Sequence, residues 1–522
     1  MKKASSFVFV VVLLVFGGVA SVAAQAPPQQ QQEGRPAMGE RPAPEAPAKE
    51  EWSVTEHTIK VGSQTIPYKA SAGTTLLKND KGEPTGLLYT VAYTRSDVKD
   101  SSTRPISFVY NGGPGSASLW LHLGAFGPRR AATVNGEFTP PPPYKLVDNN
   151  ECLLDKTDLV FIDMMGAGYS RAAGKAQEKD FWGIDEDVAA FGQFIETYIS
   201  RNGRWNSPKF LIGESYGTFR SAALGNYLQG RYSMHLNGIC LISSVLDLAS
   251  LTFGAGDDRP YIFYLPSYAA VAWYHKALQN RPASMTAFVE EARQYAAGDY
   301  ASALMKGAKL SDAEKSAVAK KLSHFTGLSE DYLLKANLRV SLGQFNVELM
   351  RSRGLTAGRI DARFTGYTRN LLSENAQGDP FNPAVGGAYT ALINYYNHEE
   401  LKFGRDKVYN NSASGAGGNW NWRRGGGGGG FFPGAPNTQN DLVQAMITNP
   451  RLLVQVENGY YDMATPFFAT EYTFTHLGLP ADLQKNIKLN YYDAGHMMYL
   501  QDADRVSLHT HVAEFIDRAT KL

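Results

Sequence analysis

The chain has 522 residues, of which 43% are hydrophobic and 19% are charged, and this composition is typical of a globular protein with a large core. Its 51 basic and 50 acidic residues give a net charge of +1, so it offers no general positive field for binding nucleic acid. Only two cysteines are present, which excludes a disulfide scaffold, a Cys-rich zinc site and an iron–sulfur cluster held by thiolates. These values indicate a neutral protein of enzyme size.

The first 24 residues are typical of a secretory signal peptide. Two lysines precede an apolar run from Phe7 to Phe16, and small residues follow as far as Ala24. Because the apolar run is far shorter than the roughly 20 residues that cross a bilayer, we expect cleavage after Ala24 and no stable membrane insertion. The mature protein is therefore expected to be exported, to the periplasm or out of the cell.

Residues 25–50 are rich in Gln, Pro, Ala and Glu. Such a segment has too little apolar surface to offset the entropy of ordering it, so we expect a disordered tether. Export would permit a disulfide between Cys152 and Cys240. However, both cysteines lie beside or within apolar, strand-like runs, which favours buried free thiols and leaves the disulfide as the alternative.

From Trp52 onward the sequence predicts short buried strands that alternate with amphipathic helices. The strands are apolar runs rich in β-branched and aromatic residues, and Gly, Asp or Asn bounds each of them. Helices are predicted over 184–200 and 504–518, where apolar residues recur at helical spacing. This order is typical of an α/β fold, with a mostly parallel central sheet flanked by helices. The predicted strands are 106–110, 159–162, 210–212, 239–242, 452–456 and 487–492.

The alternation is interrupted between about 251 and 440. Ser311 and Glu314 form a capping box ahead of a helix that ends near Gly327. A segment with Trp420, Trp422 and six consecutive glycines is typical of a mobile loop, and its tryptophans either line apolar pockets over a cleft or anchor the loop. The predicted regions are the signal peptide 1–24, the tether 25–50, a first core part 51–250, a helical insertion or lid 251–440 with the Gly-rich loop, and a second core part 441–522.

The strongest chemical signal is the pentapeptide Gly-Glu-Ser-Tyr-Gly at 213–217, which lies between a predicted strand and a predicted helix. Gly-x-Ser-x-Gly in this context is a nucleophile elbow, whose glycines allow a tight turn that projects the serine hydroxyl above the edge of the sheet. The amino terminus of the following helix favours developing negative charge. Ser215 is therefore the predicted nucleophile.

A serine nucleophile needs a histidine base and a carboxylate that orients it, in the chain order Ser, Asp, His for this fold. Asp462 and His496 each follow a predicted strand, so both are expected at the carboxyl edge of the sheet. His509 and His511 face different sides of a predicted helix and make a poor metal pair. Ser215, Asp462 and His496 are thus the predicted triad, and no metal or other cofactor is expected.

An acyl oxyanion also needs two backbone N–H donors, one from the residue after the nucleophile and one from an earlier loop. Tyr216 would supply the first donor. The second would be Gly113, in the loop Asn-Gly-Gly-Pro-Gly-Ser at 111–116. A phosphate-binding loop is the alternative, but no Lys-Ser or Lys-Thr follows these glycines.

Taken together, five motifs resemble the serine carboxypeptidase family, peptidase family S10, as in a secreted bacterial member. The resemblance implies an α/β-hydrolase fold with a helical insertion, removal of carboxy-terminal residues, activity in acid, and the triad and oxyanion donors named above. The motifs lie at 111–116, 166–170, 213–217, 458–462 and 495–497.

The family binds the terminal carboxylate of its substrate through an asparagine and two glutamic acids, which implies this role for Asn111 and Glu214. The second acid normally follows the glycine loop, where this sequence reads Leu-Trp-Leu-His-Leu-Gly at 119–124 and has no acid. A carboxyl can bond a carboxylate only when they share a proton, so we expect binding through Glu214 to improve in mild acid. The alternative is that Glu214 only braces the elbow.

The sequence therefore predicts an exported serine carboxypeptidase that hydrolyses the carboxy-terminal bonds of peptides or proteins through an acyl-enzyme. An esterase or acyltransferase with the same triad is the alternative, because fold and triad do not determine the substrate. A non-catalytic binding protein is a further alternative, which the complete triad disfavours. The sequence carries no signal for side-chain preference or oligomeric state.

Overall fold

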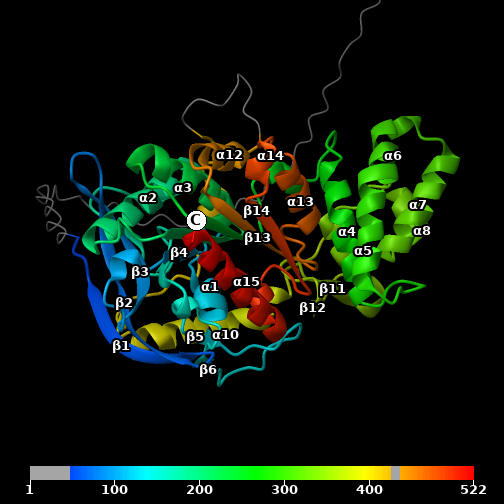
Figure 1. Ribbon diagram of the computed structural model, residues 1–522. Helices are drawn as coiled ribbons and strands as arrows, with labels where there is room; N and C mark the ends of the chain where they lie inside the picture. The colour runs from blue at the N-terminus through cyan, green and yellow to red at the C-terminus, as the bar shows by residue number, and fades with distance from the viewer. Residues whose placement is uncertain (1–47, 425–434, 522) are drawn as a thin grey trace, which may run out of the picture. The chain divides into compact units, whose positions relative to one another are not determined.

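The structure is a computed structural model that describes residues 48–424 and 435–521. Within these ranges the main sheet contains ten strands (Figure 1). In spatial order its strands are β1 (Trp52–Val61), β2 (Gln64–Lys78), β3 (Pro84–Arg95), β7 (Asp158–Ile162), β4 (Ile106–Tyr110), β9 (Lys209–Glu214), β10 (Gly238–Ile242), β13 (Leu453–Gly459) and β14 (Ile487–Tyr492), with β8 (Arg171–Ala172) beside β3.

From β7 to β14 each strand is parallel to the next one in the sheet, and five of these strands are buried along their whole length. All six strands predicted from apolar runs are present, with ends shifted by at most three residues. Because parallel strands are covered by helices on both faces, they show as continuous apolar runs in the sequence. The prediction of a mostly parallel central sheet is confirmed.

The amino-terminal part of the sheet differs from the predicted alternation of strands and helices. Strands β1, β2 and β3 are long and antiparallel, and no helix separates them. Gly62, at φ +57°, closes the turn between the first two strands. Strand β1 is exposed along one face and has no continuous apolar run, whereas β3 is largely buried and is mostly apolar from Leu87 to Tyr93. The prediction for this part was therefore wrong.

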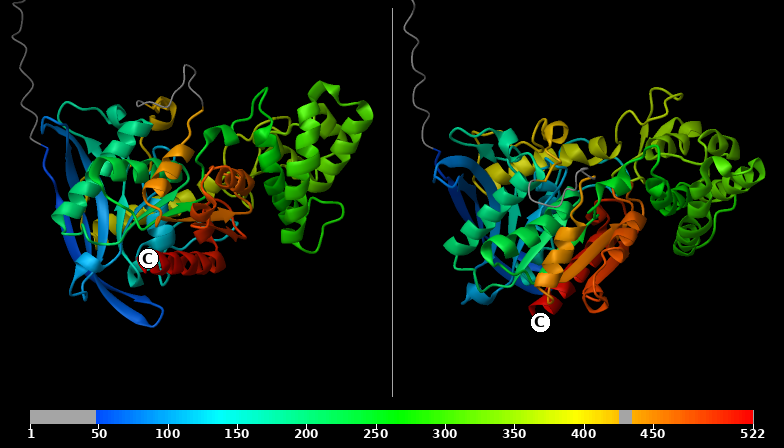
Figure 2. Two further views of the ribbon diagram at one scale, coloured as in Figure 1. Left: turned by 45° about the horizontal axis from the view of Figure 1, so that its top comes forward. Right: turned by 90° about the horizontal axis from the view of Figure 1, so that it is seen from above.

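Helices cover both faces of the parallel strands. The side chains of adjacent residues on β10 point in opposite directions: Gly238 lies against Phe515 of α15 (Asp502–Thr520), and Ile239 lies against Gly225 of α3 (Tyr216–Tyr232). Figure 2 shows α15 on one side of the sheet and α3 with α2 (Ile184–Arg201) on the other. The helices predicted over 184–200 and 504–518 are confirmed with slightly longer bounds.

The segment 251–440 divides between two hydrophobic cores. Its first helices pack on one another around their own core, which also includes Tyr461, Met463 and Phe467 (Figure 1). Its later part, including α10, belongs to the core of the main sheet. The remaining helices are α1 (Leu119–Leu121), α4 (Arg259–Tyr274), α5 (Met285–Tyr295), α6 (Ala301–Lys306), α7 (Asp312–Thr326), α8 (Glu330–Lys335), α9 (Leu342–Glu348), α10 (Phe381–Tyr395), α11 (Ala416–Asn419), α12 (Gln439–Thr448), α13 (Phe467–Thr475) and α14 (Ala481–Gln484).

The helix start and helix end predicted within this segment are confirmed. Ser311 and Glu314 form the predicted capping box at the start of α7, and Gly327 ends that helix in a left-handed conformation. Two short hairpins complete the elements, β5 (Arg129–Ala131) with β6 (Leu146–Asp148) and β11 (Leu355–Ala357) with β12 (Thr365–Tyr367).

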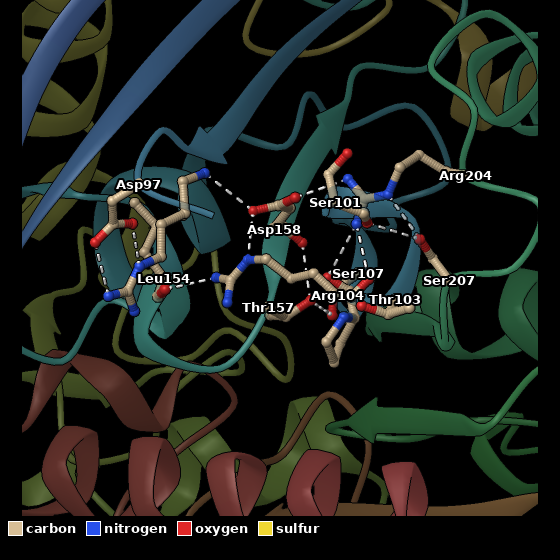
Figure 3. Close-up of polar contacts among 12 residues, drawn as sticks. Asp97, Ser101, Thr103, Arg104, Ser107, Leu154, Thr157, Asp158, Arg204 and Ser207 are labelled. Atoms are coloured by element: carbon tan, nitrogen blue, oxygen red, sulfur yellow. Dashed lines mark hydrogen bonds and ion pairs between the residues drawn. The ribbon is translucent and has the colours of Figure 1, made fainter. Parts of the chain in front are cut away.

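A buried ion-pair network holds the amino edge of the sheet (Figure 3). Asp158, the first residue of β7, accepts hydrogen bonds from Arg104 Nε at 2.8 Å and Arg204 Nη1 at 2.7 Å. Arg204 also donates to Ser207 Oγ, just before β9. One carboxylate thus ties together the starts of β4, β7 and β9, at the edge opposite to the strand ends that precede Ser215.

The two cysteines are free and buried, as favoured by the apolar runs around them. The predicted signal peptide, almost all of the predicted tether and the six consecutive glycines lie outside the described residues. In the described part of the chain, none of the helices combines the length and the apolar character that a bilayer crossing requires.

Candidate active site

Ser215 occupies a strained turn between β9 and α3. Its backbone has φ +60° and ψ −128°, a conformation that a non-glycine residue adopts at a cost on the order of 1–3 kcal/mol. A Cβ at Gly213 would collide with the backbone of Gly217, so the two glycines of the pentapeptide permit the close turn. The structure therefore has the local geometry of a nucleophile elbow.

The glycine loop lies directly against this elbow. Strand β4 pairs with β9, Tyr110 opposite Gly213, and a Cβ at Gly112 would collide with the backbone N–H of Tyr216. Gly113 has φ +110°, which favours glycine. Within the part of the chain that the structure describes, the N–H groups of Gly113 and Tyr216 donate to no protein acceptor. Both are available to bind an oxyanion.

Asp462 and His496 form a buried hydrogen-bonded pair. His496 Nδ1 lies 2.8 Å from Asp462 Oδ2, and the two side chains are 3% and 1% exposed. Asp462 Oδ2 also accepts from Thr465 Oγ1 at 2.7 Å, and Asp462 Oδ1 accepts from the N–H groups of Ala464 and Thr465. The carboxylate is therefore held in one orientation by its own loop.

The electrostatics of the pair favour a protonated imidazole. Burial lowers the pKa of His496, but the charge of Asp462 and its hydrogen bond outweigh burial, and Glu214 adds to them. The net effect raises the pKa of His496 above its usual value. An imidazolium formed by taking a proton from a serine would be stabilised in this environment.

Backbone contacts connect the loops of the three predicted residues. The N–H of Ser215 donates to Ile242 at the end of β10, and the hydroxyl of Ser243 donates to the carbonyl of His496 at 2.7 Å. Gly459, at the end of β13, approaches the backbone of Gly495 so closely that no side chain would fit. The three predicted residues thus follow β9, β13 and β14 at the carboxyl edge of the sheet. Among the described residues the Ser215 hydroxyl has no hydrogen-bond partner, so its contact with His496 stays a prediction.

A segment that follows the first helices of the insertion braces both loops. The N–H of His496 donates to Ile360, and the N–H of Met463 donates to Arg359. Asp361 Oδ2 accepts from the N–H of Gly495 at 3.2 Å and from Arg363 Nη2 at 2.6 Å. We call residues 358–364 the brace segment. No signal in the sequence pointed to it.

Asn111 and Glu214 meet beneath the elbow. Asn111 Nδ2 donates to Glu214 Oε1 at 2.6 Å, and Asn111 Oδ1 accepts from the N–H of Leu121 at 3.0 Å. Burial raises the pKa of Glu214 to about 7, although its hydrogen bonds and the charge of His496 act in the opposite direction. A carboxyl that is largely protonated in mild acid therefore lies next to the nucleophile.

Two further residues at this site were missed in the sequence. Tyr499 donates its hydroxyl to Glu214 Oε2 at 2.8 Å. The fully buried Arg220 of α3 donates to the carbonyl of Asn111 at 2.9 Å and pairs with Asp187 at 2.6 Å. A charged residue inside a helix usually faces solvent, so nothing local identified Arg220.

The tryptophans of the predicted loop pack on the elbow. Trp420 is 5% exposed, and its ring and that of Trp422 lie 5.3 and 5.9 Å from the ring of Tyr216. This packing favours the interpretation that Trp420 anchors the loop. His122 is also buried, its ring nitrogen is hydrogen-bonded to the Tyr93 hydroxyl, and burial lowers its pKa to about 3.

The fold and these side chains define a serine hydrolase with the α/β-hydrolase architecture. The model of the serine carboxypeptidase family matches residues 65–342, which is just over half of the chain. The chain belongs to the serine carboxypeptidase family, peptidase family S10, as the resemblance of its motifs implied.

One solved structure shows the same fold, and others are more distantly similar. Kex1(delta)p, a prohormone-processing carboxypeptidase from Saccharomyces cerevisiae, aligns with a TM-score of 0.54 and 14% identity, over 86% of this chain and 92% of its own. A proline iminopeptidase from Mycobacterium smegmatis aligns with a TM-score of 0.35 and 13% identity, over 89% of this chain and 99% of its own. No curated protein matches the chain significantly in sequence.

Proposed function

We propose that Ser215, His496 and Asp462 are the catalytic triad of a carboxypeptidase. Ser215 Oγ attacks the carbonyl of the last peptide bond, and His496 takes its proton and passes it to the leaving amino acid. The bond from His496 Nδ1 to Asp462 leaves Nε2 as the nitrogen that accepts this proton. Water then hydrolyses the acyl-enzyme by the same groups. The observation that carries the proposal is the buried Asp462–His496 pair beside a strained serine elbow.

The oxyanion of the tetrahedral intermediate is assigned to the N–H groups of Gly113 and Tyr216. Both are unpaired in the described protein, and Tyr216 begins helix α3, whose first N–H groups lack intrahelical partners. The free carboxylate of the substrate is assigned to Asn111 and to the protonated carboxyl of Glu214. The substrates are therefore the carboxyl ends of peptides or proteins.

The amino-terminal predictions belong to the same proposal. Residues 1–24 act as a signal peptide, residues 25–50 as a tether, and the enzyme works in the periplasm or outside the cell. Segments 51–250 and 441–522 form the hydrolase core, with 251–440 as the insertion. Amino-terminal sequencing of the exported protein tests the cleavage, since a first residue far from Gln25 would contradict it.

Digestion of defined peptides tests the activity. Peptides with a free carboxyl end should lose single residues from that end, as seen by mass spectrometry, while their amidated forms are cut more slowly. Ser215→Ala should lower turnover by about 10⁴-fold or more and abolish labelling by a fluorophosphonate. Ser507→Ala, on the exposed side of α15, is the matched control and should change neither.

The alternatives give different results. Turnover of small esters without any shortening of peptides would identify an esterase or acyltransferase and would refute the carboxypeptidase proposal. Absence of both labelling and turnover in a folded wild-type protein would indicate a binding protein.

A further inference from the structure

Tyr499 lies in a position that no part of the triad explains. It follows His496 by three residues, in the short helix η10 (Met498–Leu500), and it is 2% exposed. Its hydroxyl donates to Glu214 Oε2 at 2.8 Å, while Asn111 Nδ2 donates to Oε1 at 2.6 Å. Each oxygen of the buried carboxyl therefore has one donor, and the two donors come from opposite ends of the core sequence.

The stretch that lacks the second acid packs against this same tyrosine. A Cβ at Gly124 would come within 2.5 Å of the Tyr389 hydroxyl and of the Tyr499 ring, so the tyrosines fill the space beside the glycine. Trp120 packs on Tyr389, with ring centroids 4.7 Å apart. The phenol groups of Tyr389 and Tyr499 therefore lie next to Glu214. Members of the family that the sequence resembles have a second carboxyl in this region.

Among the described residues, four charged or titratable groups face Glu214. They are the imidazole of His496, the carboxylate of Asp462 and the phenols of Tyr499 and Tyr389. Of these, only Tyr499 is hydrogen-bonded to the Glu214 carboxyl. Its hydroxyl is the one group in this set that can both orient the carboxyl and alter its proton affinity through a direct bond.

We propose that Tyr499 completes the group that binds the free carboxylate of the substrate, as the positioning residue that holds Glu214 between itself and Asn111. This inference rests on the proposed function. It assigns recognition of the peptide's carboxyl end to one carboxyl, one amide and one phenol.

The Tyr499 hydroxyl should change the pH at which Glu214 stops binding the substrate carboxylate. A hydrogen bond from Tyr499 is stronger to the ionised carboxylate than to the neutral acid, so it favours ionisation of Glu214 and opposes the larger effect of burial. Removing the hydroxyl raises the pKa of Glu214 further. Because the protonated carboxyl binds the substrate carboxylate, that binding then persists to higher pH.

The experiment measures kcat/KM against pH for a blocked dipeptide and for its carboxy-terminal amide, and follows the ratio of the two. In Tyr499→Phe the midpoint at which this ratio falls should move up by about one pH unit. Site-specific replacement of Tyr499 by 3-fluorotyrosine, which keeps the shape and strengthens the donor, should move it down. Tyr300→Phe is the matched control, since Tyr300 is buried and donates to the Leu338 carbonyl in the other core.

The outcomes separate this inference from the proposed function. If the wild type discriminates between acid and amide, but neither replacement of Tyr499 shifts the ratio, only the role of Tyr499 is refuted. Equal loss of activity on both substrates with an unshifted midpoint would likewise reduce Tyr499 to a packing residue. If the wild type treats acid and amide alike at every pH, the carboxypeptidase proposal and this inference both fail. Should Tyr499→Phe not fold, the fluorotyrosine protein alone decides the sign.

Discussion

Single residues at the elbow combine strain with an unusual charge state. Ser215 holds a backbone conformation that few non-glycine residues adopt, and this conformation lifts its side chain out of the turn. The preceding residue, Glu214, is buried, and both oxygens of its carboxyl are hydrogen-bonded within the protein. Water therefore does not solvate a negative charge on this carboxyl. Burial therefore makes the neutral acid the dominant form below a pH of about 7.

Glu214→Gln should remove the pH dependence of carboxylate recognition. In the wild type the protonated carboxyl donates a hydrogen bond to the substrate carboxylate below its pKa of about 7, and the ionised carboxylate repels it above that pKa. The acid-to-amide ratio of kcat/KM should therefore fall by about 10–100-fold as pH rises. The glutamine amide is neutral throughout, so its ratio should stay flat. Titration of His496 affects both substrates alike and cancels in the ratio. Identical ratios in both enzymes would show that Glu214 only braces the elbow.

At the scale of elements, the brace segment connects two loops that the sequence separates. The carbonyl groups of Arg359 and Ile360 accept hydrogen bonds from the N–H groups of Met463 and His496, which lie in the loops of Asp462 and His496. The Asp361–Arg363 ion pair inside it is almost fully buried and also bonds to Gly495 and to the carbonyl of Asp493. The brace segment therefore directly supports the loops of the proposed residues Asp462 and His496.

Asp361→Ala should lower both stability and turnover. The substitution leaves the Arg363 guanidinium buried without its partner, which costs about 3–5 kcal/mol in the free energy of unfolding. It also removes the acceptor of the Gly495 N–H, so kcat per labelled active site should fall. Asp258→Ala is the control, because the Asp258–Arg339 pair is partly exposed and contributes about 1 kcal/mol or less. Equal losses in the two variants, measured by denaturant unfolding, would contradict the argument.

At the scale of the whole molecule, the two edges of the sheet have different roles. The loops of the proposed catalytic and oxyanion residues follow the carboxyl ends of β4, β9, β13 and β14, whereas the buried Asp158 network lies at the amino ends of β4, β7 and β9 (Figure 3). In parallel sheets these edges are separated by the length of the strands. Stability and chemistry can therefore be changed separately.

Asp158→Ala should destabilise the protein without harming its chemistry. Two arginine side chains, 10% and 3% exposed, would lose their shared carboxylate, which costs about 3–5 kcal/mol in the free energy of unfolding. Turnover per fluorophosphonate-labelled site should match the wild type, in contrast to Asp361→Ala. A comparable fall in turnover per site would show that the amino edge is coupled to the triad.

The sequence by itself determined the features that depend on neighbouring residues. Apolar runs predicted the central strands because both faces of a parallel sheet are buried, and Gly-x-Ser-x-Gly predicted the elbow because its turn needs glycine at two fixed positions. The triad Ser215, Asp462 and His496 could be proposed from the sequence because each residue lies within four positions of the end of its own strand. Family membership was visible for the same reason, since its motifs are local.

Only the tertiary structure decided which distant side chains meet. Tyr499 is hydrogen-bonded to Glu214, which is 285 residues away in the sequence, and Gly495 is hydrogen-bonded to Asp361, which is 134 residues away. Arg220 lies under Asn111 although a helical arginine normally faces solvent. The antiparallel strands at the amino end also escaped prediction. Strand β1 is half-exposed and has no continuous apolar run, whereas β3 is largely buried and its mostly apolar residues from Leu87 to Tyr93 were not recognised as a strand. Such contacts depend on how the sheet, loops and insertion pack in three dimensions, and no spacing along the chain encodes them.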